Sequence, residues 1–332
     1  MTGLSQALTA RCVPGGGLAV DRVDRSVPTP AGHDLLVRVR AISVNPVDVK
    51  RVRASERGII PGFDAVGEVV ATGPAACAHH VGDRVFYAGT LQRDGAAQDT
   101  HLVDERLCAR APTGWEDTDA AALPLTMITA WEALIDKLDC APSHEETILV
   151  VGGAGGVGSA VIQLARALLP AVDIIATASR SDSAAWARRQ GAHHVVDHTE
   201  PLAPQVRALS PGGVTKIVST ASGGRIEEFA DVLSPFGHVV GVDRGPIDVT
   251  PLKPLSATWH WIYMFTKAVP DWSGPGTPHA MILERVAELA ANGKLRSPVH
   301  SVVPELTVDS LRDALLTIEG GHGVGKTVIR LE

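Results

Sequence analysis

The chain has 332 residues, of which 45% are hydrophobic and 20% charged, a composition typical of a globular protein rather than a disordered one. Its formal net charge of −7 argues against nucleic-acid binding, because such surfaces need clustered lysine and arginine. The sequence has no run of about 18 uncharged apolar residues and no signal-peptide pattern, so we expect a cytoplasmic protein that does not bind a membrane.

The first third of the chain has the pattern of short strands separated by turns. Apolar and polar residues alternate between Leu36 and Val44, which is the period of a half-buried strand. The segments AVGEVVATG and GDRVFYAG are further strand-like runs that end in glycine. These segments predict a small β-barrel or sandwich over residues 11–110.

The pattern changes near Asp119, where a segment with helical periodicity begins. An apolar run, a glycine-rich turn and a second helical segment follow it. Four strand-like segments, DIIATAS, HHVVDH, KIVST and HVVGVD, then alternate with helical ones. Such alternation predicts an α/β domain with a doubly wound parallel sheet.

The glycine-rich turn fits the pattern G-x-G-x-x-G and lies between an apolar strand, Ile148 to Val151, and a helix. In a dinucleotide-binding site, the first glycine allows the tight turn and the second lets the backbone approach a pyrophosphate. The third packs the helix against the strand, and the helix N-terminus offers N–H groups to the phosphates. We therefore predict a cofactor-binding loop made of Gly153, Ala154, Gly155, Gly156, Val157 and Gly158.

The end of the next strand, Asp173 to Ala178, indicates which dinucleotide binds. An acidic residue there would bind the ribose hydroxyls of NAD, but this strand is followed by Ser179 and Arg180. A guanidinium suits a 2′-phosphate because its planar fork can bind two oxygens. Asp182 follows closely, and we interpret it as the cap of the next helix. The sequence thus favours NADPH as the cofactor.

Several stretches, in this order, resemble one known family. They are VNPVDVK, PGFDAVGEVV, GDRVFYAG, AAALPLTMITAWEAL, VVGGAGGVGS, ATASR, GAHHVVDH, WHWIYMFTK and GKTVIRL, and they cover nearly the whole chain. The chain resembles the zinc-free quinone oxidoreductase branch of the medium-chain dehydrogenase/reductase superfamily. Among its members, the bacterial proteins called zinc-type alcohol dehydrogenase-like look most similar.

This resemblance implies a GroES-like β-barrel catalytic domain over residues 1–125, completed by residues 268–332. It implies an NADPH-binding Rossmann domain over residues 126–267. Members of the family are commonly dimers or tetramers joined through the Rossmann sheets, and we expect a homodimer. It also assigns cofactor contacts to Asn45, Thr129, His198 and Lys326. Quinone oxidoreductases often have a tyrosine at the position of His198, so this chain departs from the family there.

The family's zinc enzymes bind the metal through an early cysteine, a Gly-His-Glu turn and a later cysteine or aspartate. This chain has Asn45 and Gly62-Phe63-Asp64 at the corresponding places. Phenylalanine cannot bind zinc, and the four cysteines lie far apart in the sequence. We therefore predict a protein without a bound metal.

Three residues are candidates for catalysis. Without a metal, hydride transfer depends on orientation and on a polarised acceptor. Tyr87 could donate its hydroxyl hydrogen to a substrate oxygen, or it could pack at the barrel edge. Asp48 could be an acid or the structural partner of Lys50 or Arg53. Asn45 lies, by resemblance, where the nicotinamide is approached.

We predict an NADPH-dependent, metal-independent reductase of quinones or conjugated enones, including enoyl groups. Two alternatives remain open at this point: an NADPH-binding protein with little turnover, in a crystallin-like or sensor role, and a zinc alcohol dehydrogenase, which Phe63 disfavours. An aromatic run from Trp259 to Phe265 could line the substrate pocket or pack in an interface.

Overall fold

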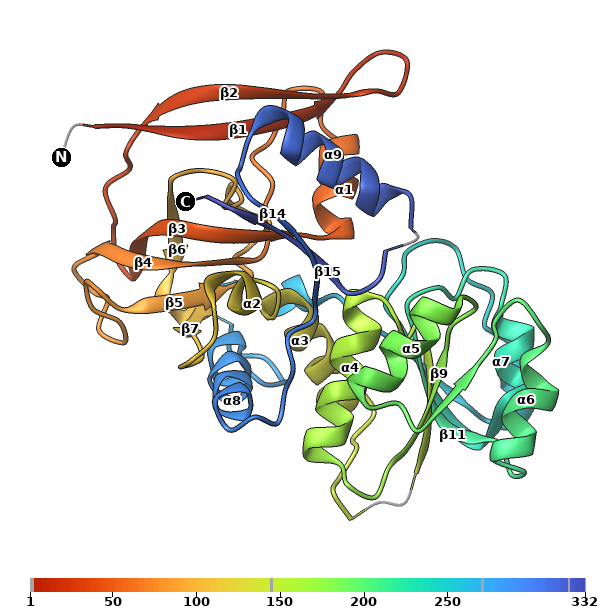
Figure 1. Cartoon of the computed structure of the whole chain (residues 1–332). Helices are drawn as coiled ribbons and strands as arrows, with labels where there is room; N and C mark the ends of the chain where they lie inside the picture. Colours follow the sequence, from red (N-terminus) through yellow and green to blue (C-terminus); the bar gives the residue numbers. More distant parts are fainter. Residues whose placement is uncertain (1–2, 144–145, 270–271, 322, 332) are drawn as a thin grey trace. The chain divides into compact units, whose positions relative to one another are not determined.

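Figure 1 shows a computed structural model of the chain, which describes residues 3–143, 146–269, 272–321 and 323–331. The chain forms two compact units. The first unit comprises Met1–Ile128 and Phe265–Glu332, and the second comprises Thr129–Met264. Each unit has its own hydrophobic core. The predicted combination of a β-rich part and a doubly wound parallel sheet is confirmed.

The first unit contains a seven-stranded sheet in the order β14-β15-β3-β4-β5-β7, with β6 paired to β3. The strand predicted between Leu36 and Val44 lies inside β3. The C-terminal strand β15 runs antiparallel to β3, so residues from the two ends of the sequence pair in one sheet. The strands are β3 (Asp34–Val44), β4 (Ala65–Thr72), β5 (Arg84–Tyr87), β6 (Thr100–Asp104), β7 (Cys108–Arg110), β14 (Val299–Val303) and β15 (Lys326–Arg330), with a separate hairpin of β1 (Leu4–Cys12) and β2 (Leu18–Ser26).

The helices of the first unit begin where local sequence signals favour them. The segment with helical periodicity from Asp119 is interrupted, and Pro124 begins a new helix because proline lacks the N–H that a helix interior needs. Leu311 and Leu315 of α9 are fully buried in the core under the sheet. The helices are α1 (Pro46–Arg53), α2 (Asp117–Ala121), α8 (His279–Ala291), α9 (Val308–Glu319) and two short turns, η1 (Glu105–Leu107) and η4 (Met264–Lys267); α3 (Pro124–Trp131) crosses the boundary between the units.

The second unit is a six-stranded parallel sheet in the order β10-β9-β8-β11-β12-β13. Residues 148–151 of the central strand β8 are at most 1% exposed, as expected for a parallel strand covered on both faces. The elements are β8 (Thr147–Val151), α4 (Gly156–Leu168), β9 (Asp173–Thr177), α5 (Ser181–Gln190), β10 (His194–Val196), α6 (Leu202–Leu209), β11 (Val214–Ser219), α7 (Ile226–Val232), β12 (Leu233–Gly241) and β13 (Thr258–Trp261), with η2 (Glu132–Lys137) and η3 (Thr250–Leu255).

This strand order determines where a ligand can bind. The chain leaves β8 toward β9 on one side and returns to β11 on the other, so the connections separate at the carboxyl end of β8. Open parallel sheets bind their ligands at such a switch point. The glycine-rich loop lies at this point, directly after β8. Among the described residues, no helix is both long enough and apolar enough to cross a bilayer.

Candidate active site

The turn after β8 is made by a glycine that the motif did not single out. Gly152 has a φ of 83°, in the left-handed region that favours glycine. Its N–H donates to the Thr177 hydroxyl at 3.0 Å, which ties the loop to the end of β9. Gly153, the first glycine of the motif, lies in the same turn, but the left-handed residue is the preceding Gly152.

The three motif glycines meet different surroundings. A Cβ on Gly153 would lie 2.7 Å from the Cβ of Ala176, and one on Gly158 would lie 2.2 Å from the carbonyl oxygen of Gly152. Both glycines therefore allow close packing within the unit. A Cβ on Gly155 would meet no atom closer than 3.5 Å, so the space on its outer side is open. Since Gly155 is also the N-cap residue of α4, this space fits a phosphate group near the helix N-terminus.

Strand β9 lies next to β8, which precedes this loop, and β10 follows on the far side of β9 in the same sheet. Arg180 follows β9; its side chain is 47% exposed, and its Nε lies 3.5 Å from the Asp182 carboxylate. Asp182 does not cap α5 as predicted: the N-cap residue is Arg180, and Asp182 lies in the first turn. Ser179 is half-buried beside Arg180, and His198 is exposed beyond the end of β10.

Thr129, also predicted to contact the cofactor, is 3% exposed on α3. It is therefore almost inaccessible to solvent, and its role stays a prediction.

In the first unit, two predicted site residues meet in a buried polar cluster. The Lys326 ammonium donates to the Asp64 carboxylate at 2.9 Å and to the side-chain oxygen of Asn45. The Asn45 amide donates one hydrogen to Asp64 at 2.8 Å and the other to the Ser43 carbonyl at 3.1 Å. Asn45 therefore has no amide hydrogen left for a substrate or a nicotinamide in this arrangement.

Asp64 is the centre of this cluster, and it was not among the predicted site residues. Its second carboxylate oxygen accepts from the backbone N–H of Leu125 at 2.7 Å, near the start of α3. One carboxylate thus holds the starts of α1, α3 and β15. Burial raises the pKa of Asp64, and the Lys326 ammonium opposes that rise. A carboxylate inside the apolar run PGFDAVGEVV was the signal that could have identified it, since a buried charge needs a partner.

Asp48 has a structural role at the start of α1. Its carboxylate accepts from the backbone N–H groups of Asn45 at 2.7 Å, Gly62 at 2.6 Å and Phe63 at 3.2 Å. Burial raises the pKa of Asp48 to about 6, against the effect of these hydrogen bonds. The predicted basic partner is wrong, because the carboxylate is used by backbone amides.

Arg53, one of the two basic partners considered for Asp48, pairs with Glu319 instead. It thereby links α1 to α9, which pack together in the first unit.

Tyr87 is 1% exposed and lies in the hydrophobic core of the first unit. Its hydroxyl is 3.0 Å from Nδ1 of His101, whose Nε2 is 2.9 Å from the Asp94 carbonyl oxygen. A carbonyl can only accept, so Nε2 carries a hydrogen. Burial lowers the pKa of His101 to about 4, so the ring is neutral and Nδ1 accepts the Tyr87 hydroxyl hydrogen. The hydroxyl is thus used by His101, and no contact supports a catalytic role, which stays a prediction.

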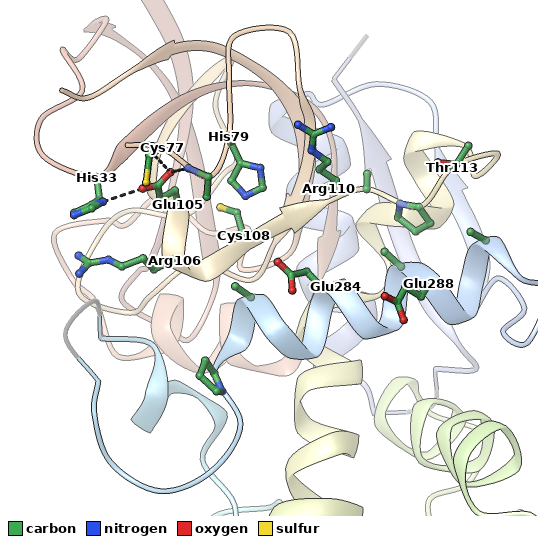
Figure 2. A pocket seen from close by; sticks show the side chains of 17 residues that line it. His33, Cys77, His79, Glu105, Arg106, Cys108, Arg110, Thr113, Glu284 and Glu288 are labelled. Atoms are coloured by element: carbon green, nitrogen blue, oxygen red, sulfur yellow. Dashed lines mark hydrogen bonds and ion pairs between the residues drawn. The ribbon is translucent and has the colours of Figure 1, made fainter. Parts of the chain in front are cut away.

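A separate cavity of about 790 Å³ lies in the first unit. Figure 2 shows its lining side chains, which come mainly from β7, the loop at Cys77 and α8. The Glu105 carboxylate at its wall accepts from the backbone of Cys77 and Ala78 and from His33. None of the predicted site residues lines this cavity.

Comparison with known proteins identifies the family. Residues 31–124 match the alcohol dehydrogenase GroES-like domain, and residues 190–329 match the zinc-binding dehydrogenase domain. A zinc-type alcohol dehydrogenase-like protein of Staphylococcus epidermidis is 33% identical over 95% of this chain and 96% of its own length. The chain belongs to the medium-chain dehydrogenase/reductase superfamily.

One further relative supports its place among the quinone-oxidoreductase-like members, and a solved structure supports the fold. A chloroplastic quinone-oxidoreductase homolog of Spinacia oleracea is 30% identical over 95% of both chains. The crystal structure of a protein from Rhizobium etli CFN 42, assigned to the zinc-dependent alcohol dehydrogenases, has a TM-score of 0.90, 37% identity and 99% coverage of both chains. The predicted GroES-like and Rossmann domains are thereby confirmed, and so is an oxidoreductase of a family that binds a nicotinamide cofactor.

Despite the names of these relatives, the residues of this medium-chain dehydrogenase/reductase do not fit a catalytic zinc. Phe63 is 1% exposed and packs edge-on against Phe265, with 6.0 Å between the ring centres. Asn45 and Asp64 already bind a buried ammonium, whose positive charge would repel a metal ion. Within the described part of the chain, no three histidine, cysteine, aspartate or glutamate side chains are grouped to hold a metal.

Proposed function

We propose that the chain is an NADPH-dependent, metal-independent reductase that transfers hydride to a quinone or a conjugated enone. The observation that carries the proposal is the Lys326–Asp64–Asn45 cluster beside Phe63. By resemblance, Asn45 and Phe63-Asp64 correspond to positions of the metal ligands in the family's zinc enzymes. Zinc would stabilise an alkoxide, so a site without it is poorly suited to oxidise simple alcohols.

With a conjugated acceptor, the protein needs to stabilise less of the negative charge that hydride addition produces. Hydride added at its β-carbon leaves an enolate or a hydroquinone anion, whose charge is delocalised over the acceptor itself. Orientation by the cofactor and the pocket supplies much of the remaining catalysis. The relative from Spinacia oleracea, named a quinone-oxidoreductase homolog, supports quinones as one acceptor class.

The preference for NADPH over NADH is supported by Arg180. This half-exposed guanidinium follows β9, where an NAD-specific site would have an acidic residue at the strand end. Asp182 is 3.5 Å away but lies in the first turn of α5, where its charge also suits the helix N-terminus.

The test is a screen of cofactor oxidation by the purified protein. We expect NADPH to be oxidised by quinones, enals or enones, and almost no reduction of NADP⁺ by ethanol-type alcohols. Brisk alcohol oxidation without any quinone or enone turnover would contradict the proposal.

One observation favours a second candidate, an NADPH-binding protein with little turnover. The hydrogens of two predicted site residues, those of the Asn45 amide and the Tyr87 hydroxyl, are used inside the first unit. This alternative predicts tight NADPH binding by titration and no NADPH oxidation with any acceptor of the screen.

We further propose a cytoplasmic homodimer. The four cysteines of the chain are free, which suits the reducing cytoplasm.

The dimer is proposed from an edge of the second sheet. Strand β13 lies at this edge, and Trp261 and Tyr263 at its end are 49% and 57% exposed. An apolar sheet edge of this kind suits pairing with a second copy. Sedimentation should give a dimer, and Trp261→Glu should shift it toward the monomer.

A further inference from the structure

We infer that a second pocket of the first unit binds an anionic group of the substrate, a carboxylate or a phosphate ester. This inference rests on the proposed function. The pocket has a volume of about 460 Å³ and lies among β2, α1, β6 and the residues that precede β6. Its size is that of a small-molecule site. We call it the arginine pocket; its charged and imidazole lining residues are Arg25, Arg51, Arg93, Asp94 and His101.

The charge of this lining is opposite to that of the whole chain. Three arginines face one carboxylate, although the chain carries a net charge of −7. Arg25 pairs with Asp94 at 2.6 Å, and Arg93 pairs with Asp34 at 2.7 Å. His101 adds no charge near neutral pH, because burial lowers its pKa to about 4. The pocket is therefore positive overall.

Arg51 is the cation in this pocket without an acidic partner among the described residues. One of its terminal nitrogens donates to the Leu91 carbonyl at 3.0 Å, and its Nε is buried without a hydrogen-bond partner. A buried donor needs an acceptor, which here a water molecule or a bound ligand has to supply. The guanidinium fork matches the two oxygens of a carboxylate or phosphate.

The position of Arg51 connects the pocket to the polar cluster. Its guanidinium lies over the Phe63 ring, 5.2 Å from the ring centre. Phe63 precedes Asp64, and Arg51 lies on α1, whose N-cap residue is Asn45. Arg51 and the cluster are thus linked by α1 and by Phe63, whose backbone leads directly into Asp64. Because the anion site and the cluster share this helix, we assign the site to a group of the substrate rather than to an unrelated free anion.

The test compares two enones that differ in one group, a carboxylate and its methyl ester. We expect the wild-type protein to reduce the acid with the higher kcat/KM, and added salt to diminish the difference. Arg51→Gln should lower kcat/KM for the acid by about 10- to 100-fold, the worth of a hydrogen bond to a charged group. The ester should be reduced by this variant at nearly the wild-type rate.

Two control variants show whether the effect comes from the guanidinium of Arg51 or from the loss of a positive charge in general. Arg110→Gln removes the same charge at an exposed residue that lies outside this pocket, and it should leave the preference for the acid intact. Arg51→Lys keeps the charge without the fork, and it should retain part of the preference. If Arg51→Gln does not fold, Arg25→Gln serves instead, because it leaves the Asp94 carboxylate in the pocket without its partner and should also reduce the preference.

A binding measurement keeps this inference distinct from the proposed function. The saturated analogue of the acid cannot accept hydride, yet calorimetry should detect its binding to the wild-type protein and not to Arg51→Gln. If no enone is reduced but this difference is seen, the proposed function fails and the anion site stands. Equal reduction of acid and ester, or binding of inorganic phosphate at Arg51 without any preference for the acid, would overturn the inference.

Discussion

The ammonium of Lys326 lies 2.9 Å from the carboxylate of Asp64, and at most 3% of either side chain is exposed. The two residues are far apart in the sequence, and their contact fixes the last strand of the first unit against the loop before β4. Removing one partner of a buried ion pair leaves the other charge without compensation, which costs more than the pair itself contributes.

We therefore expect Lys326→Met to lower the free energy of unfolding by about 3–5 kcal/mol in chemical denaturation. The double variant Asp64→Leu with Lys326→Met should lose less than the sum of the two single losses. The partly exposed Arg53–Glu319 pair is the control, and Glu319→Gln should cost about 1 kcal/mol or less. Additive losses at Lys326 and Asp64 would contradict a coupled pair.

Alanine variants at two glycines of the cofactor loop should have different effects, one on stability and the other on NADPH affinity. Gly158→Ala places a Cβ 2.2 Å from a backbone oxygen, so we expect a lower melting temperature. Gly155→Ala meets no atom within 3.5 Å, and its φ of −73° suits alanine, so its stability should match the wild type. Its NADPH affinity should nevertheless fall at least tenfold (about 1.4 kcal/mol), because the methyl group occupies the phosphate space. Undiminished binding by Gly155→Ala would show that the pyrophosphate lies elsewhere.

Arg180 provides a test of cofactor choice. If its guanidinium binds the 2′-phosphate, Arg180→Ala should weaken NADPH binding by about 1.5–3 kcal/mol and leave NADH binding nearly unchanged. Arg188→Ala removes an exposed arginine from the same helix and serves as the control. Equal losses of NADPH and NADH affinity in titrations of Arg180→Ala would exclude the assignment.

The Tyr87–His101 pair should be visible in stability. Tyr87→Phe leaves the buried Nδ1 of His101 without its donor, so we expect a loss of about 1–3 kcal/mol in the free energy of unfolding. If the hydroxyl acted on substrate instead, kcat would fall at unchanged cofactor affinity, and the two measurements distinguish these roles.

The same histidine gives a pH dependence of defined sign. The pKa of His101 is about 4 in the folded protein, against 6.5 for an ordinary histidine. The unfolded chain therefore binds a proton first as the pH falls, and stability decreases between pH 6.5 and 4 by about 3 kcal/mol. Asp48, whose pKa is raised to about 6, acts in the opposite direction over part of this range. Comparing wild type with His101→Phe by denaturation at pH 7 and pH 4.5 isolates the histidine contribution; an unchanged difference between the two would contradict it.

Metal content tests the argument from Phe63. We expect elemental analysis of the purified protein to find no stoichiometric zinc, and chelators to leave activity unchanged. Zinc bound at one equivalent per chain, with activity lost on its removal, would refute this prediction.

The sequence by itself determined the features that depend on local pattern. The alternation in residues 36–44, the apolar strand before the glycine loop and the strand–helix alternation after it predicted the α/β fold, because these periodicities reflect which faces are buried. The sequence alone also shows that Phe63 stands where the family's zinc enzymes have a histidine ligand. Even the position of the cofactor loop followed from chain order, since a switch point lies directly after the first strand of such a sheet.

The tertiary structure decided which polar groups have partners. Asp64 and Lys326 lie 262 residues apart, so no local pattern could pair them. The residue type of Tyr87 allows its hydroxyl to act in catalysis, but in the fold His101, on another strand, accepts the hydroxyl hydrogen. Arg51 differs from the other arginines of its pocket only in what the fold brings near it. The residue type sets the charge and the hydrogen-bonding capacity of a side chain. Whether its donors and acceptors already have partners depends on neighbours that only folding brings together.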